Sequence, residues 1–169
     1  MSDTASLVSY QLDGLAPGRS PFPAAPPPGI TLRRADLAAD LPAMVELCRA
    51  SFQAASSVAG DDEVAACAEL ADLLRHPGLA PPGAFLALDG DLFVGLGVGR
   101  VEVPARGEGT RRAAIELLAV RPGYRRRGLA RALLGRLLAW LAARGVDTVV
   151  ASTEDPVVAA MLERHGFRA

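Results

Sequence analysis

The pattern of apolar and polar residues predicts regular elements from residue 30 onward. Short runs rich in Val, Leu and Ala predict strands over 30–34, 113–120 and 147–152, and two apolar runs around Asp89-Gly90-Asp91 predict a hairpin over 83–103. Apolar residues three and four apart predict helices over 37–52, 63–76, 128–144 and 155–165. A strand-helix-strand-helix order ends the chain, so one strand pair is parallel while the hairpin is antiparallel. The predicted fold class is therefore α/β, with a mixed central sheet flanked by helices.

The first 29 residues differ from the rest in composition. Six prolines fall between Pro17 and Pro28, which indicates an N-terminal extension that is partly extended or disordered. The weak alternation over 6–15 allows one short strand before these prolines. Residues 30–169 form the predicted globular domain.

Composition narrows the function classes. The 169 residues suit one domain, and a formal net charge of −1 gives no reason to expect nucleic acid or a membrane as partner. The N-terminus lacks a secretory signal, and no run of about 20 uncharged apolar residues predicts a membrane span. Cys48 and Cys67 lack metal-ligand spacing, so we expect reduced thiols, a cytoplasmic protein and no metal site.

The stretch "VRPGYRRRGLARALL", residues 120–134, carries the strongest chemical signal. It joins a predicted strand to a predicted helix, whose first turn has free backbone N–H groups and the positive end of the helix dipole. The small Gly128 and Ala130 would let an anion approach the backbone, so residues 125–131 suit a phosphate or pyrophosphate. No Lys-Ser/Thr pair follows the glycine, and "GLGVG" at 95–99 has no helix after it, which weakens a nucleotide-binding reading. A solvated helix start remains the alternative.

This stretch resembles the phosphate-binding signature of the GCN5-related N-acetyltransferases, the GNAT superfamily. Arg125-x-x-Gly128-x-Ala130 follows a Val-x-Pro strand end as in that family, "LERHGF" is similar to its later Gly-Phe segment, and "TLRRADLAADLPAMVEL" to its opening strand and helix. The resemblance covers about residues 30–167 and implies acetyl-CoA, or another acyl-CoA, as co-substrate and an amine as acceptor.

The resemblance also implies where the donor would bind. The backbone amides of residues 126–131 would hold the pyrophosphate, and the backbone of Leu118, Ala119 and Val120 would pair with pantetheine where strand 113–120 diverges from strand 147–152. The arginine side chains would form a basic rim or reach the 3′-phosphate. The residues expected to bind the donor are therefore Leu118, Ala119, Val120, Arg125, Arg126, Arg127, Gly128, Leu129, Ala130, Arg131 and Asp155.

Acyl transfer to an amine requires that the acceptor lose a proton, and Glu116 is the candidate general base. On a regular strand Ala114, Glu116, Leu118 and Val120 share one face, which would place the carboxylate beside the donor. An edge or surface glutamate is the alternative. Residues 61–63, all acidic, flank the expected acceptor loop, and a solvated helix start also explains them.

The sequence departs from the family pattern at two places. Leu162 stands where many members have the tyrosine that acts as general acid, and Asp155 stands at the usual asparagine position, where it also suits a helix N-cap. His165 near a helix end suits a cap or surface group.

The second departure is that the chain stops at Ala169, so the strands that usually follow the Gly-Phe segment are missing. Pairing of residues 7–12, a neighbouring chain in a homodimer, or a shortened chain would each explain this.

Two function classes remain open. The first is an N-acetyltransferase that moves an acetyl group from acetyl-CoA directly to a primary amine in a ternary complex. The second is a non-catalytic acyl-CoA-binding or regulatory domain, which Leu162 favours. Whether the acceptor is a small molecule or a protein is not decided by the sequence.

Overall fold

The computed structural model describes residues 7–23, 25–53, 68, 72, 83–102 and 111–169. Their strands are β1 (Val8–Leu12), β2 (Ile30–Arg34), β3 (Gly83–Asp89), β4 (Leu92–Val101), β5 (Arg112–Val120) and β6 (Thr148–Thr153). Their helices are α1 (Leu37–Gln53), the 3₁₀ turn η1 (Pro122–Tyr124), α3 (Leu129–Ala142) and α4 (Pro156–Arg164). The predicted helix over 63–76, Cys67 and the acidic run at 61–63 lie outside the described residues.

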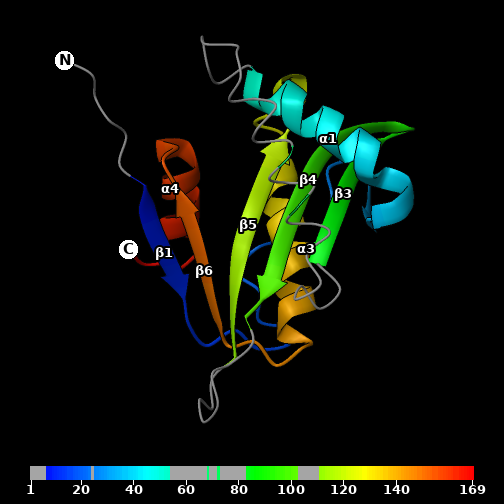
Figure 1. Cartoon of the computed structure of the whole chain (residues 1–169). Coiled ribbons are helices and arrows are strands. Elements are labelled where there is room, and N and C mark those ends of the chain that lie inside the picture. Colours follow the sequence, from blue (N-terminus) through cyan, green and yellow to red (C-terminus); the bar gives the residue numbers. More distant parts are fainter. Residues whose placement is uncertain (1–6, 24, 54–67, 69–71, 73–82, 103–110) are drawn as a thin grey trace, which may run out of the picture.

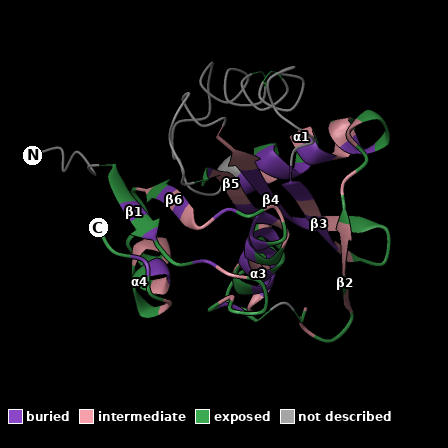
Figure 2. Ribbon diagram, turned by 90° about the horizontal axis from the view of Figure 1, so that it is seen from below, coloured by how far each residue is buried: buried purple, intermediate pink, exposed green. Residues whose placement is uncertain are grey.

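The described strands form one sheet in the order β1-β6-β5-β4-β3-β2. Only the β5–β6 pair is parallel, and the other neighbours are antiparallel. Helices α3 and α4 lie on one face and α1 on the other, so the sheet is the middle of three layers (Figures 1 and 2). The predicted mixed α/β sheet and the hairpin β3–β4 are confirmed.

Glycines in β4 allow α3 to pack close to the sheet. A Cβ at Gly95 or Gly97 would lie 3.0 or 2.9 Å from a methyl carbon of Leu133 or Leu137 on the helix, closer than side chains tolerate. The glycines of the "GLGVG" run, which lacks the helix that a phosphate-binding glycine loop requires, therefore make room for the side chains of α3. None of the described helices is long and apolar enough to cross a membrane.

Strand β1 occupies the sheet edge next to β6. Val8 pairs with Thr153 and Leu12 with Val149, and the far side of β1 is bridged at Gln11 by Arg168. The expectation that residues 7–12 cover this edge is confirmed for Val8–Leu12.

The segment between β1 and β2 contributes to the core. These strands are the two edges of the described sheet, so the described residues 13–23 and 25–29 belong to a segment that leads from one edge to the other. Leu15 and Phe22 are buried along the way, and the Phe22 ring stacks on His165 with centroids 4.2 Å apart. His165 therefore belongs to a packed contact, and its Nδ1 lies 2.8 Å from the carbonyl oxygen of Met161.

We predict that Phe22→Ala lowers the free energy of unfolding by about 3 kcal/mol, because it empties a core position that is only 3 % exposed. Urea denaturation measures this change. Leu7→Ala, at a side chain that is 63 % exposed, serves as control and should change stability by less than about 0.5 kcal/mol. Equal midpoints for both variants would show that the segment does not pack as described.

Candidate active site

Strands β5 and β6 separate halfway along β5. Their parallel register runs from Arg112↔Thr148 to Ile115↔Ala151 and stops, while β5 continues to Val120 (Figure 1). On its other side this continuation stays paired with β4, with Leu118 opposite Gly97 and Val120 opposite Gly95. Leu118, Ala119 and Val120, expected to contact the donor, thus lie on a stretch with one side unpaired among the described strands.

A β-bulge at Glu116 changes which residues of β5 face each side of the sheet. Gly99 of β4 pairs with Ile115 and Val98 with Leu117, so Glu116 is an extra residue on β5. Beyond the bulge Leu117 packs in the cluster under α1, whereas Leu118 and Val120 pack in the clusters on the α3 side. The prediction that Glu116 shares a face with Leu118 and Val120 is therefore wrong, because an extra residue reverses the alternation.

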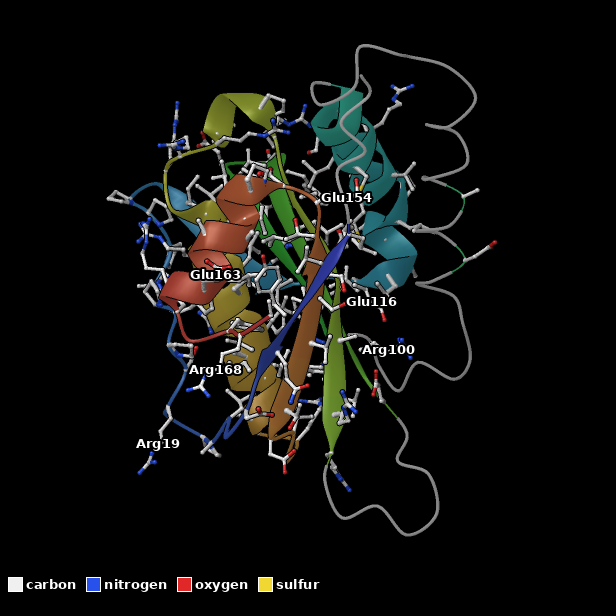
Figure 3. All side chains as sticks on the ribbon, turned by 90° about the vertical axis from the view of Figure 1, so that its left-hand side faces the viewer. Arg19, Arg100, Glu116, Glu154, Glu163 and Arg168 are labelled. Atoms are coloured by element: carbon white, nitrogen blue, oxygen red, sulfur yellow. The ribbon has the colours of Figure 1, made fainter. Side chains whose placement is uncertain are left out.

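The carboxylate of Glu116 pairs with Arg100 of β4. Arg100 Nε donates to Glu116 Oε1 at 2.6 Å, and the two side chains are 39 % and 24 % exposed. Arg100 alternates with Leu96 and Val98, which pack under α1, so the pair lies on the α1 face of the sheet (Figure 3). Sequence reasoning missed Arg100, because its approach to Glu116 depends on the β4–β5 register.

The turn between β5 and α3 presents unpaired backbone donors. Gly128 is the N-cap of α3 with φ 86°, and Arg126 also has a positive φ of 64°. The first bond of the helix runs from Ala132 N to Gly128 O, and within the described part of the chain no acceptor is bonded to the amides of residues 126–131. Such a row of N–H groups at a helix start binds anions. A Cβ at Gly128 would meet only Arg131 Nη2, at 3.6 Å, so the backbone is accessible there.

The three consecutive arginines have different surroundings. Arg125 donates from Nη2 to Ser51 O at 2.7 Å and from Nε to Val120 O at 3.2 Å, so it ties the end of α1 to the end of β5. The Arg127 guanidinium lies 5.1 Å from the centroid of the Tyr124 ring, and all three arginines are exposed. The expected basic rim is thus formed by Arg126, Arg127 and the exposed Arg131, while the Arg125 side chain makes internal contacts.

Other predicted site residues have structural contacts. Leu129 is buried in the core, so only its backbone faces the turn. Asp155 caps α4, since its Oδ1 accepts from Val157 N at 2.8 Å. Leu162, at the family's tyrosine position, is 2 % exposed and packs in the core cluster that contains Tyr10. Burial and, second, the charge of Glu163 raise the Tyr10 pKa above its ordinary value.

A second phenol lies near the turn. Tyr124 Oη donates to Asp89 Oδ2 at 2.8 Å, and this hydrogen bond, together with burial, raises the Tyr124 pKa. Its hydroxyl hydrogen is engaged by the hairpin turn that joins β3 to β4, so it contributes to positioning the ring beneath Arg127.

The diverging parallel strands β5 and β6 thus lie next to a helix start whose amides have no acceptor in the described part of the chain. The chain matches the family described as acetyltransferase (GNAT) family over residues 41–167. It belongs to that family.

Solved structures share the fold. An acetyltransferase from Trypanosoma brucei is 23 % identical and superposes with a TM-score of 0.61; the match covers 83 % of this chain and 93 % of the acetyltransferase chain. A GCN5-related N-acetyltransferase from Sphaerobacter thermophilus is 24 % identical with a TM-score of 0.64, covering 96 % of this chain and 47 % of its own. An aminoglycoside N-acetyltransferase in complex with CoA is 17 % identical with a TM-score of 0.62, covering 83 % and 88 %. Comparison with curated proteins finds no match.

We predict that Arg125→Ala lowers the free energy of unfolding by about 1–3 kcal/mol, because it removes two charge-assisted hydrogen bonds to backbone carbonyls. Arg126→Ala, at an equally exposed neighbour for which the described residues offer no such hydrogen bonds, is the matched control and should change stability by less than about 0.5 kcal/mol. Chemical denaturation of both variants measures the difference. A stable Arg125→Ala variant would contradict the internal role of this side chain.

Proposed function

We propose that the protein is an N-acetyltransferase that transfers an acetyl group from acetyl-CoA directly to a primary amine. The observation that carries this proposal is the row of amides at residues 126–131, which have no acceptor in the described part of the chain and directly follow the stretch of β5 that is unpaired on one side among the described strands. Membership of the acetyltransferase family adds to it. Several fold relatives are acetyltransferases, and one is in complex with CoA.

The donor would bind along the end of β5 and the start of α3. The amides of residues 126–131 would hold the pyrophosphate, and the αL conformation and absent Cβ of Gly128 fit this role. Arg126, Arg127 and Arg131 would add positive charge for the phosphates. The backbone of Leu118, Ala119 and Val120 would pair with pantetheine in place of the strand partner that β5 loses beyond Ile115. Acetyl-CoA supplies the activated thioester.

Transfer requires removal of a proton from the acceptor. A primary amine is mostly an ammonium ion near pH 7, since its pKa is close to 10.4, and only the neutral amine attacks. Glu116 would take this proton, directly or through water, from the α1 face of the sheet. A backbone N–H near Val120 would stabilise the oxygen on which negative charge develops. The new C–N bond then replaces the C–S bond, and the amine nitrogen loses its second proton as the thiol forms.

The leaving group does not need a dedicated acid. A thiol has a pKa near 8.5, about two units below the acceptor ammonium, so a thiolate departs readily and is protonated afterwards. Leu162 at the family's tyrosine position is therefore compatible with turnover. The rate would depend more on Glu116 than on a general acid.

A non-catalytic acyl-CoA-binding domain is the second candidate. It is favoured by the buried Leu162 and by the engagement of Glu116 with Arg100 at 2.6 Å. The two candidates differ in one measurement, the release of free thiol from acetyl-CoA in the presence of amines.

We predict that Glu116→Gln reduces kcat about 10²–10⁴-fold at neutral pH and leaves CoA affinity within about twofold, because the amide cannot accept the proton. Thiol release with an amine panel and CoA titration calorimetry measure the two quantities. Glu154→Gln, on an exposed carboxylate after β6, is the control and should keep activity. An unchanged rate in Glu116→Gln removes this residue from the mechanism, and CoA binding without turnover in the wild type supports the second candidate.

We predict that Gly128→Asp weakens CoA binding at least about tenfold, because it adds a side chain and a negative charge at the start of α3. Gly145→Asp introduces the same change at a glycine with φ +72° beyond the other end of this helix, so it controls for backbone strain and net charge. Calorimetric titration of CoA into each variant measures affinity. Equal affinity of both variants would contradict a donor site at the turn.

A further inference from the structure

Arg100 has a guanidinium edge that Glu116 does not use. Only its Nε bonds to Glu116, so the two Nη groups remain without a partner in the described part of the chain. This edge is the part of arginine that pairs bidentately with a carboxylate. An acceptor that reaches Glu116 with its amine meets this edge at the same place, because the two side chains are in contact.

Further charged side chains follow on the same face of the sheet. Arg100 pairs with Ala114, and Arg112 lies two residues from Ala114 on β5, so Arg112 shares their face at about 7 Å along the strand. Its guanidinium has no partner among the described residues. Glu102 lies two residues after Arg100 and therefore on the same face. Its backbone amide donates to Arg112 O at 2.9 Å, so Glu102 is a neighbour of Arg112 across the two strands. The face thus presents both signs of charge at short intervals.

A hollow of about 550 Å³ lies beside Arg112, at β1, β6 and the C-terminal residues Arg168 and Ala169. Its lining includes Arg112 and Arg168 together with Gln11 and Val150. The acid in the lining, Asp13, already accepts hydrogen bonds through Oδ1 from Gln11 Nε2 at 2.8 Å and Thr148 Oγ1 at 3.1 Å. The lining therefore offers an anion the guanidinium groups of Arg112 and Arg168, which have no side-chain partner among the described residues, and a carboxylate that is already hydrogen bonded.

These charges discriminate among amines. A guanidinium beside Glu116 repels an approaching ammonium ion, and a second positive charge on the acceptor would be repelled again by Arg112. A carboxylate on the acceptor reverses the sign of this interaction and pairs with the free edge of Arg100. A balanced face of this kind favours a dipolar ligand over a polycation.

We propose that the acceptor is a zwitterion, an amine that also bears a carboxylate, with the amine at Glu116 and the carboxylate bound by Arg100 and, for longer acceptors, by Arg112. This inference rests on the proposed function and specifies its substrate class. Arg100 is then the specificity-determining residue for the acceptor, in addition to positioning Glu116.

The test measures kcat/KM of the full-length protein for matched acceptors, with acetyl-CoA as the donor. 4-Aminobutyrate and 6-aminohexanoate are compared with their carboxamides, which keep the amine and remove the negative charge, and with 1,5-diaminopentane as a dication. We expect kcat/KM at least about tenfold higher for each carboxylate than for its amide, as charge-assisted pairs predict. The diamine should be the poorest acceptor.

Variants assign the preference to its residues. Arg100→Gln should bring the carboxylate-to-amide ratio of kcat/KM to within about threefold of one, and Arg112→Gln should lower it for 6-aminohexanoate more than for 4-aminobutyrate. Arg136→Gln on α3, an exposed arginine on the opposite face, should keep the wild-type ratio. The ratio is insensitive to a general loss of activity, so it separates acceptor recognition from the support that Arg100 gives Glu116.

The outcomes distinguish the two levels of the proposal. Turnover in which amides or the diamine equal the carboxylates, or a preference that survives both Arg100→Gln and Arg112→Gln, overturns the zwitterion assignment and leaves the acetyltransferase function intact. Absence of thiol release with every amine overturns the proposed function and the substrate class with it.

Discussion

One extra residue in β5 sets the geometry of the candidate site. The bulge at Glu116 comes directly after Ile115, the last residue of β5 that pairs with β6. Bulges bend a strand and increase its twist, and β5 diverges from its parallel neighbour at this point. The same residue turns Glu116 to the α1 face while Leu118 and Val120 face α3. The proposed donor backbone and the candidate base therefore belong to neighbouring residues of one strand, with the backbone at the unpaired edge of β5 and the carboxylate on the α1 face.

Close packing of α3 on β4 holds the start of this helix next to the end of β5. Alternate glycines in β4 replace side chains that would collide with Leu133 and Leu137, so the helix lies directly on the strand. A buried Leu129 at the first helical position fixes its N-terminus in the core. The unpaired amides of residues 126–131 are thus held by packing rather than by polar contacts of their own, and Arg125 adds a tie to the end of α1.

The sequence predicted features that depend on local chemistry. The start of α3 at Gly128, the Asp155 cap and the β3–β4 turn follow from residue types at short spacing, and all are found. The bulge was not predictable, because the expected alternation of side chains between the two faces assumes a strand without an extra residue. Arg100 was missed for a related reason, since a single arginine in an apolar run has no partner until the register is known. The weak alternation in residues 8–12 allowed a strand, but only the fold shows why it is needed beside β6.

The proposed donor and acceptor contacts are different kinds of groups. The proposed donor contacts are mostly backbone amides, which most substitutions leave in place as long as α3 keeps its position. The proposed acceptor contacts are side chains of β4 and β5 on the α1 face of the sheet, and each can be exchanged without disturbing the helix start. A change at Arg100 would therefore alter which amine is used while acetyl-CoA is still bound. The fold therefore constrains the first set of groups and leaves the second free to vary.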